Sequence, residues 1–371
     1  MASSLERRWC QLISGETRGP LGTLSRAGLD AAAGLYWLGL RANLGVYEWG
    51  LKPRTRPALS VASIGNLTLG GTGKTTAVRF LVGRLAQGGL KAGIVLRGHR
   101  SRVRSCCLAA DGQGNTLGAD VVGDEASEYI RLLPETPVAV GKRREISIGL
   151  LAQAGAQVAV LDDGYQYFRM HRDVEVALVS ARTDLRLARL FPRGILREPW
   201  SHLRRADQVW ITHADQVGPG ELDEVRGLVR RHAPQASVAL TVHRPQALVD
   251  LASGTERPPE ELRGERVVAL SALGSPATFE ASLRSLGCRV VPLRFPDHHD
   301  YREEDWQRGA VLAREHGATF IVTTLKDAVK VSFPVPWPTL VLRSELGFLA
   351  GEEHVDALTQ HLRQGMSGAQ A

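Results

Sequence analysis

Short apolar runs alternate with longer amphipathic stretches along most of the chain. This alternation is typical of α/β proteins, in which buried strands of a parallel sheet are followed by covering helices. In the first half, runs rich in β-branched residues predict strands at 58–64, 92–96, 158–161 and 174–179. The segment 75–86 after the first strand has the apolar spacing of a helix.

The same alternation restarts after about residue 207 and predicts a second α/β layer structure. Its strands are expected at 209–212, 238–242, 267–270, 290–295, 320–324 and 340–342, and its helices near 221–232, 276–286 and 303–316. Between the predicted strands 92–96 and 158–161, the Gly-, Asp- and Asn-rich stretch 108–120 predicts a loop or hairpin. We expect a disordered tail from Gly365 onward.

The N-terminal segment 26–51 is apolar and helix-like. Its longest uncharged run, 31–40, is too short to span a bilayer, and the first 20 residues lack the features of a signal peptide. Aromatic residues with flanking basic residues suit a helix that lies among lipid headgroups, and a helix packed on the protein body is an equal alternative. The aromatic residues are Tyr36, Trp37, Tyr47 and Trp49.

A glycine-rich loop, GNLTLGGTG at 65–73, joins the first predicted strand to its helix. Glycines let backbone N–H groups turn toward an anion, and the helix N-terminus adds partial positive charge. A lysine that follows can reach the β- and γ-phosphates, and a threonine hydroxyl can bind Mg²⁺. Gly-Lys-Thr alone is usually a turn, but strand, loop and helix in this order favour a nucleotide site. Its residues would be Gly70, Gly71, Thr72, Gly73, Lys74, Thr75 and Thr76.

Carboxylates and basic residues follow other predicted strands. The buried run 158–161 leads into Asp162 and Asp163, which would hold Mg²⁺ beside the phosphate loop. Arg97 follows strand 92–96 in a basic cluster that could meet phosphate or simply be solvated. Asp124 and Glu125 begin a helix, which such residues can also merely cap. Asp297–Asp300 and Lys326–Asp327 follow strands of the second half, where clustered Asp and His are more often structural.

The composition narrows the class of partner. A net charge of +7 and a pI near 9.5 favour an anionic partner. Aromatic residues make up only 6%, and no RNA-binding or zinc-finger spacing occurs, so a nucleic acid is the weaker choice. The cysteines Cys10, Cys106, Cys107 and Cys288 have no metal-ligand spacing, which suits a reducing compartment.

Seven separated motifs together resemble, in the same order, those of the tetraacyldisaccharide 4′-kinase family, from about Leu35 to Arg343. They are GNLTLGGTGKT (65–75), LRGH (96–99), GDEASE (123–128), LDDGYQYFRMHRD (161–173), GILREP (194–199), FPDHHDY (295–301) and TTLKDAVK (323–330). The resemblance implies a P-loop NTPase-like α/β/α sandwich, a second, smaller α/β/α domain and an N-terminal amphipathic, membrane-associated helix. The corresponding ranges are 53–206 for the P-loop domain, 207–346 for the second domain, 1–52 for the membrane segment, and 347–371 for a C-terminal helix and flexible tail.

The resemblance also implies a reaction. ATP, with Mg²⁺, would phosphorylate the 4′-hydroxyl of an acylated glucosamine disaccharide 1-phosphate, giving lipid IVA in lipid A (lipopolysaccharide) biosynthesis. The protein would be peripheral or monotopic on the cytoplasmic face of the inner membrane. The expected partners are this lipid and the inner-membrane surface, without nucleic acid.

Carried onto this chain, the family motifs assign roles to individual residues. Asp124 and His298 would form the proton-accepting pair, assisted by Lys74 on the phosphates. The metal would be held by Thr75, Asp162, Asp163 and Glu125. The substrate would be bound by Arg97, His99, Gln166, Arg197 and Glu198. The chain departs from the usual family motif at Tyr165 and Tyr167, which replace Phe and His, and at His99, where Tyr is common.

Other classes of protein fit the sequence less well. A GTP-hydrolysing switch needs Asn-Lys-x-Asp or Thr-Lys-x-Asp, whereas Lys326 and Asp327 are adjacent here. A membrane-surface P-loop ATPase of the positioning type shares the loop but does not need the Gly-Asp-Glu and Asp-His motifs. A nucleic-acid-dependent ATPase is suggested by charge alone and would bind DNA or RNA in a salt-sensitive way.

Overall fold

The computed structural model describes residues 4–98, 101–297 and 299–368, and the chain forms two compact units. The larger unit contains Glu6–Val242 and the C-terminal segment from Phe348, and the smaller unit contains His243–Gly347. Residues 207–242, which the apolar pattern grouped with the second layer, lie in the larger unit. Their strands extend its sheet by parallel pairing, which a pattern of buried residues alone does not reveal.

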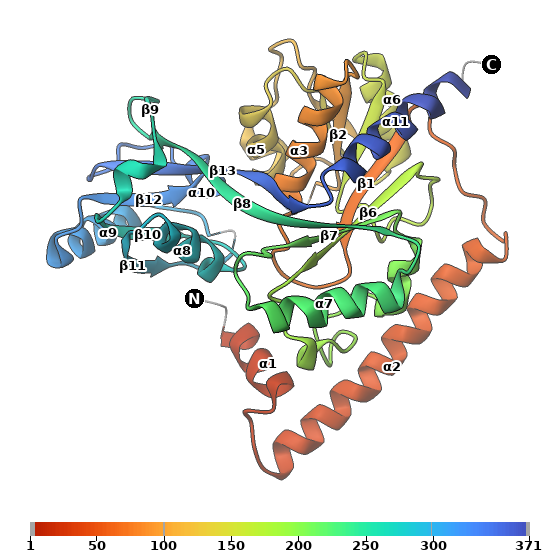
Figure 1. The fold of residues 1–371 in the computed structure, drawn as a ribbon, viewed down its shortest axis with the longest axis horizontal. Coiled ribbons are helices and arrows are strands. Elements are labelled where there is room, and N and C mark those ends of the chain that lie inside the picture. The colour runs from red at the N-terminus through yellow and green to blue at the C-terminus, as the bar shows by residue number, and fades with distance from the viewer. Residues whose placement is uncertain (1–3, 99–100, 298, 369–371) are drawn as a thin grey trace. The chain divides into compact units, whose positions relative to one another are not determined.

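The larger unit is built on a parallel sheet with strand order β8-β7-β6-β1-β5-β2-β4-β3 (Figure 1). In this order β3, at the edge, runs antiparallel to β4, and the pairs from β8 through β4 are parallel. The strands are β1 (Ser60–Asn66), β2 (Ala92–Leu96), β3 (Cys107–Ala110), β4 (Val138–Val140), β5 (Val158–Asp162), β6 (Val174–Ser180), β7 (Gln208–Thr212) and β8 (Ser237–Asp250). Every residue of β5 and β6 is buried, as expected for central strands covered on both faces.

Helices cover both faces of this sheet. They are α3 (Lys74–Gln87), α4 (Ala119–Val122), α5 (Asp124–Leu132), α6 (Arg144–Gln153), α7 (Pro219–His232) and α11 (Glu353–Gly368), with short 3₁₀ turns η1 (Leu185–Leu187) and η2 (Trp200–Arg205). Neighbouring residues of β7 point to opposite faces. Ile211 joins Val225 and Val229 of α7 in one hydrophobic cluster, whereas Trp210 contacts Phe80 of α3 at a ring-centroid distance of 6.1 Å.

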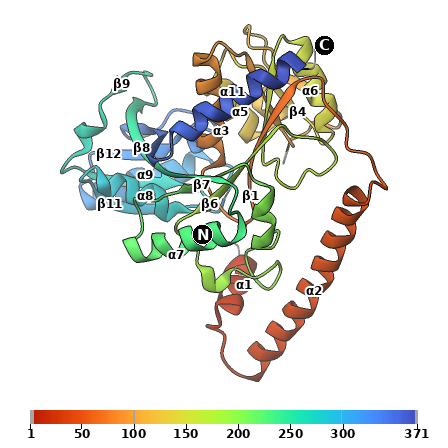
Figure 2. The same ribbon diagram turned by 45° about the vertical axis from the view of Figure 1, so that its right-hand side comes forward.

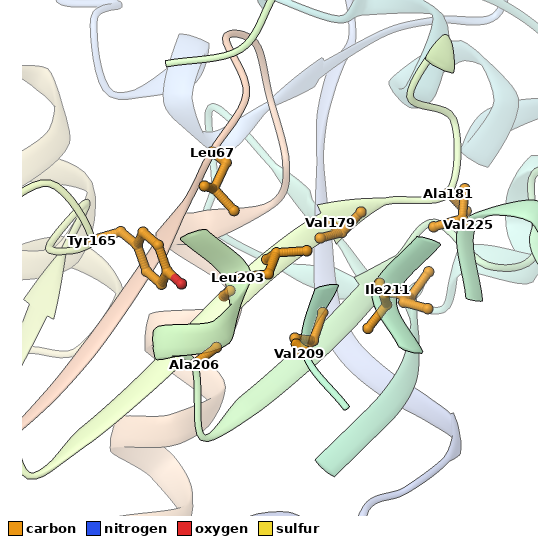
Figure 3. Close-up of a cluster of buried hydrophobic side chains, with 12 residues drawn as sticks. Leu67, Tyr165, Val179, Ala181, Leu203, Ala206, Val209, Ile211 and Val225 are labelled. Atoms are coloured by element: carbon orange, nitrogen blue, oxygen red, sulfur yellow. The ribbon is translucent and has the colours of Figure 1, made fainter. Parts of the chain in front are cut away.

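The cluster beneath α7 extends to the loop after β5 (Figure 3). Tyr165, Leu203 and Val179 lie in it, together with Leu67, which follows β1. All four side chains are almost completely buried. Because these side chains pack closely, they hold the loops after β1 and β5 against each other and fix the positions of the residues in both loops.

The smaller unit is built on parallel strands with helices on both faces. The parallel strands are β10 (Arg266–Ser271), β11 (Arg289–Arg294), β12 (Phe320–Thr324) and β13 (Thr339–Ala350). The helices are α8 (Pro276–Ser285), α9 (Glu303–His316) and α10 (Leu325–Ala328). The unit also contains the short strand β9 (Glu256–Arg257), which pairs with β8, and a 3₁₀ turn, η3 (Pro259–Leu262). Alternate residues of β10 separate two clusters: Val267 packs with Leu283 of α8, and Val268 packs with Trp306 of α9.

Two helices precede the sheet of the larger unit: α1 (Ser4–Ser14) and the long α2 (Pro20–Glu48). Both views show α2 extended along the outside of the larger unit (Figures 1 and 2). Leu35, Trp37 and Leu38 are exposed on it. No helix in the described ranges 4–98, 101–297 and 299–368 is long and apolar enough to cross a bilayer.

The predicted α/β class is confirmed, and the main differences lie at element boundaries. Strand β1 begins and ends two residues later than expected, because Gly65 and Asn66 still pair with β6. Strands β8 and β13 continue well past 238–242 and 340–342. The predicted helix 26–51 instead spans Pro20–Glu48, since Pro20 at its first turn favours helix initiation.

Other segments differ from expectation in kind. Strand β4 and helix α6 were not predicted, and β3 occupies the start of the expected loop or hairpin 108–120. The chain does reverse direction within that stretch, because Ala110 and Thr116 form an antiparallel β-bridge. Helix α11 runs past Gly365 to Gly368, so the disordered tail predicted from Gly365 is wrong at its start. Its apolar residues Val355, Leu358 and Leu362 are buried on the larger unit, which stabilises the helix.

Candidate active site

The phosphate loop lies between β1 and α3, as the sequence predicted. Gly70 and Gly73 adopt φ angles of 101° and 79°, a region that favours glycine, and α3 begins at Lys74. Gly65 has a different role: a Cβ atom there would lie 2.7 Å from the Cβ of Tyr165. Glycine at 65 is therefore required for the loop after β5 to approach the loop after β1.

Strand pairing brings the predicted carboxylates to this loop. In the parallel pair β1–β5, Ile64 is opposite Asp162. The chain after both strands therefore emerges at the same edge of the sheet, where α/β proteins bind ligands. The four residues Lys74, Thr75, Asp162 and Asp163 all lie at this edge.

A buried asparagine that the sequence analysis missed organises the loop. Asn66 is fully buried, and its amide nitrogen donates hydrogen bonds to the Thr72 hydroxyl and the Thr68 carbonyl, each 3.0 Å long. Its amide oxygen accepts a hydrogen bond of 3.3 Å from Lys74 Nζ. One side chain thus fixes both the loop and its lysine. A polar residue closing a buried strand was the available signal, because such a group needs partners.

Asp163 lies between two cations. Arg197 Nη1 donates to both carboxylate oxygens at 3.0 and 2.9 Å, and Lys74 Nζ lies 3.5 Å from one of them. Burial alone would raise the pKa of Asp163, but Lys74 and Arg197 outweigh it and hold the pKa below its usual value. Asp163 also has a positive φ of 53°, which is uncommon for a residue other than glycine. The sequence assigned Arg197 to the substrate, and the structure places its guanidinium on this carboxylate.

Asp162 is more deeply enclosed and has an oxygen suited to a metal. The Tyr129 hydroxyl of α5 donates to its Oδ2 at 2.9 Å, whereas Oδ1 is buried without a hydrogen bond from any described residue. Burial raises the pKa of Asp162, and Lys74 partly opposes that shift. An unsatisfied carboxylate oxygen beside a phosphate loop fits Mg²⁺, which commonly takes one or two carboxylates and completes its shell with phosphate and water. Thr75, which also hydrogen-bonds Tyr129, lies next to this group.

A buried arginine, Arg144, holds the backbone of Asp163 beside the two carboxylates. Arg144, at the start of α6, donates from Nη2 to the carbonyl of Asp163 at 2.9 Å. Its guanidinium lies 5.2 Å from the centre of the Tyr167 ring, and the Tyr167 hydroxyl accepts from the Arg144 backbone and donates to Glu145. Burial, together with the hydrogen bond to Glu145, raises the pKa of Tyr167 to about 12, so the hydroxyl keeps its proton. The residue that replaces the usual family histidine therefore holds Arg144.

Glu198 lies at the centre of a buried polar network. Its carboxylate is fully buried and accepts hydrogen bonds from Gln166 Nε2 at 2.9 Å and Arg205 Nη1 at 2.8 Å, and His202 Nδ1 lies 2.7 Å away. Gln166 Nε2 also donates to the backbone carbonyl of Asn66 at 2.9 Å. Both oxygens of Glu198 are thus engaged by the protein. The network connects the loop after β5 to the start of the phosphate loop.

The remaining predicted residues are distributed as follows. Asp124 and Glu125 form the first turn of α5, where the helix dipole favours negative charge, and both are half-buried. Arg97 is exposed just after β2, and its positive charge adds to the lowering of the pKa of Arg144 that burial chiefly causes. His99 and His298 lie outside the described residues. The hydroxyl that Tyr165 has in place of the usual Phe donates to the carbonyl of His202 at 2.8 Å.

Known proteins resemble this chain in both sequence and fold. Residues 26–363 match the family model described as tetraacyldisaccharide-1-P 4′-kinase. A tetraacyldisaccharide 4′-kinase of Anaeromyxobacter dehalogenans (strain 2CP-C) is 39% identical over 89% of this chain and 86% of its own length. One from Geobacter sulfurreducens is 35% identical over 87% and 89%. The crystal structure of LpxK from Aquifex aeolicus in complex with ATP superposes with a TM-score of 0.71 at 26% identity, covering 91% of this chain and 99% of that one.

The Glu198 network leads to a prediction about pH. Burial alone would raise the pKa of Glu198, but hydrogen bonds from His202, Arg205 and Gln166 lower it. A carboxylate with a lowered pKa stabilises the fold above its unfolded pKa of about 4.3, and this contribution is lost as the pH falls through the folded pKa. Glu198→Gln should therefore reduce the free energy of unfolding at pH 7 by about 3 kcal/mol, with a smaller difference from wild type near pH 3.5.

Urea unfolding followed by circular dichroism at both pH values measures this difference. Glu224→Gln, at an exposed position of α7, serves as the control and should change stability little at either pH. An equal destabilisation by Glu198→Gln at pH 7 and at pH 3.5 would show that the charge of Glu198 is not what stabilises the network.

Proposed function

The chain belongs to the tetraacyldisaccharide-1-P 4′-kinase family, and from this membership we propose how its residues carry out the reaction. It is an ATP-dependent kinase that phosphorylates the 4′-hydroxyl of a tetraacylated disaccharide, a step of lipid A biosynthesis. The observation that carries the residue assignments is the meeting of a phosphate loop with two carboxylates at one sheet edge. The positioning-type ATPase is not favoured, because the family match includes the GDEASE and FPDHHDY motifs.

The phosphates of ATP are bound by the loop and by Lys74. The backbone N–H groups of residues 70–76 and the N-terminus of α3 would face the anion, and the hydrogen bond from Lys74 to Asn66 holds Lys74 beside the loop. Thr75, Asp162 and Asp163 would hold Mg²⁺, with Glu125 as a further ligand, and the ion supplies charge neutralisation on the phosphates when bound. Phosphoryl transfer depends mainly on positioning and electrostatics, so these contacts account for much of the catalysis.

The acceptor hydroxyl needs a group that takes its proton. Asp124, with His298 as its partner, accepts the proton of the 4′-hydroxyl as the oxygen–phosphorus bond forms and the bond to the ADP leaving group breaks. The support for Asp124 is its helix. Helix α5 begins at Asp124 and carries Tyr129, whose hydroxyl is fixed on Asp162. The proposed base and a proposed metal ligand are therefore held by the same element.

The disaccharide head group is bound by Arg97, His99, Gln166, Arg197 and Glu198. Gln166 contributes through its amide oxygen, since its nitrogen is bonded to Glu198 and Asn66. Glu198 contributes by accepting a hydrogen bond from Gln166, which holds Gln166 in this orientation. Arg197 would contact the head group while its guanidinium stays hydrogen-bonded to Asp163. These assignments carry the family roles onto this chain and use the contacts of the described residues as support.

A lipid substrate favours an enzyme that works at a membrane surface. We propose that α2 rests on the cytoplasmic face of the inner membrane, with Leu35, Trp37 and Leu38 toward the lipid. These three side chains are exposed within about one turn of α2, since an α-helix has about 3.6 residues per turn, and apolar and aromatic residues of this kind suit the headgroup region. A helix that lies on the surface would bring the phosphate site close to an acceptor embedded in the bilayer.

The proposed base can be tested by label transfer. With γ-³²P-ATP, Mg²⁺ and tetraacyldisaccharide 1-phosphate in detergent, wild-type protein should label the lipid, and Asp124→Asn should lower kcat by about 100-fold or more because the proton acceptor is lost. Asp120→Asn, an exposed position of α4, is the matched control and should retain wild-type activity. Label transfer by Asp124→Asn at the wild-type rate would refute the base, and ATP hydrolysis without labelled lipid in wild type would refute the kinase.

The membrane contact can be tested by sedimentation with vesicles. Replacing Leu35, Trp37 and Leu38 together by Ser should reduce binding to phosphatidylethanolamine–phosphatidylglycerol vesicles several-fold, because apolar surface at the interface is lost. The control replaces three exposed apolar residues elsewhere, namely Ile146, Val311 and Leu349, by Ser. Equal sedimentation of both triple variants would argue against α2 as the lipid-facing element.

A further inference from the structure

Tyr36 differs from its neighbours on α2 because its hydroxyl is bonded to the protein. It donates a hydrogen bond of 2.8 Å to the backbone carbonyl of Arg197, a residue far away in sequence. Leu35 and Leu38 beside it are 72% and 56% exposed, compared with 37% for Tyr36. Burial and the nearby Glu198 raise the pKa of Tyr36, so the hydroxyl keeps the proton that it donates. The sequence grouped Tyr36 with lipid-facing aromatic residues, and this contact gives it a different partner.

The residue that Tyr36 contacts is itself tied to the phosphate site in two ways. The backbone N–H of Arg197 donates to the carbonyl of Leu67, and that of Leu69 donates to the carbonyl of Ile195, each at 2.7 Å. Segment 195–197 thus forms a short ladder with segment 67–69, which leads into the phosphate loop. The guanidinium of Arg197 meanwhile bonds both oxygens of Asp163.

The other contacts of α2 with this region are weaker. Asp30 is half exposed to solvent, and its carboxylate lies 3.3 Å from Arg193 and 3.6 Å from Arg189. Ion pairs this open to water contribute little. The ring of Tyr36 also meets Phe191 edge-on at 6.1 Å. Among these contacts, the hydroxyl of Tyr36 alone reaches a residue that bonds a site carboxylate.

We propose that Tyr36 is a positioning residue for phosphoryl transfer, which fixes the backbone of Arg197 so that its guanidinium stays on Asp163. Helix α2 thereby serves the phosphate site as well as the lipid surface. This inference rests on the proposed function, because Asp163 and Lys74 matter only if they handle ATP. It adds a contribution from the N-terminal helix that acts through Arg197 without touching substrate.

The test compares two Tyr→Phe variants on the same helix. Tyr36→Phe removes only the hydroxyl, and we expect kcat to fall about three- to tenfold, the usual effect of losing one hydrogen bond. The KM for the lipid and sedimentation with phosphatidylethanolamine–phosphatidylglycerol vesicles should stay at wild-type values. Tyr47→Phe is the control and should be fully active, since no hydrogen bond of the Tyr47 hydroxyl occurs among the described residues.

A double-mutant cycle with Arg197→Lys tests whether Tyr36 affects phosphoryl transfer through Arg197. If Tyr36 acts through Arg197, Tyr36→Phe should have little further effect in the Arg197→Lys background, whereas independent residues would give multiplied losses. Wild-type kcat in Tyr36→Phe, multiplied losses, or a change confined to lipid KM and vesicle binding would each overturn the proposal. Wild-type protein that labels no lipid would instead refute the proposed function, so the two failures are distinguishable. Thermal unfolding of both Tyr→Phe variants verifies that they are folded.

Discussion

The ion pairs around Asp163 are the interaction on which the site depends. Two adjacent carboxylates at the end of a buried strand repel each other, and burial makes their charge costly. Lys74 and Arg197 offset this cost on Asp163, while Asp162 keeps a buried oxygen without a hydrogen bond from the described residues. Positive charge must therefore surround the pair before it can take part in phosphate chemistry. The same arrangement brings the phosphate-loop lysine close to the proposed metal ligands.

Most of the surrounding fold serves to hold these groups in place. The parallel pairing of β1 with β5 brings the loop and the carboxylates to one edge. Asn66 then accepts a hydrogen bond from Lys74 and fixes its position. Arg144 donates to the backbone carbonyl of Asp163 and so stabilises the uncommon positive φ of that residue. Glu198 ties the loop after β5 to the start of the phosphate loop through Gln166. Asn66, Arg144 and Glu198 are buried, Gln166 is partly buried, and all four are hydrogen-bonded, so the site is preorganised by the protein.

Local patterns in the sequence predicted the elements and the residues at their ends. The glycine loop followed by Lys74, and the buried run ending in Asp162, are each contained in one short stretch, and both meet at the sheet edge as expected. Contacts between distant residues could not be predicted this way. The Tyr36 hydroxyl donates to the backbone carbonyl of Arg197, which is 161 positions away in sequence. Gln166 donates to the backbone carbonyl of Asn66, which is 100 positions away. Roles that the family resemblance gives to Asp124 and Arg97 stay predictions, as do those of His99 and His298, which lie outside the described residues.

We propose that Asp162 holds the metal that accompanies ATP at this site, and the other site roles depend on this one. Isothermal titration of ATP into wild-type protein and Asp162→Asn, each with and without Mg²⁺, tests it most directly. We expect Mg²⁺ to tighten ATP binding by wild type about tenfold or more and to have little effect on the variant, because a carboxamide is a poor ligand for Mg²⁺. An equal effect of Mg²⁺ on both proteins would contradict the claim and move the metal away from the end of β5.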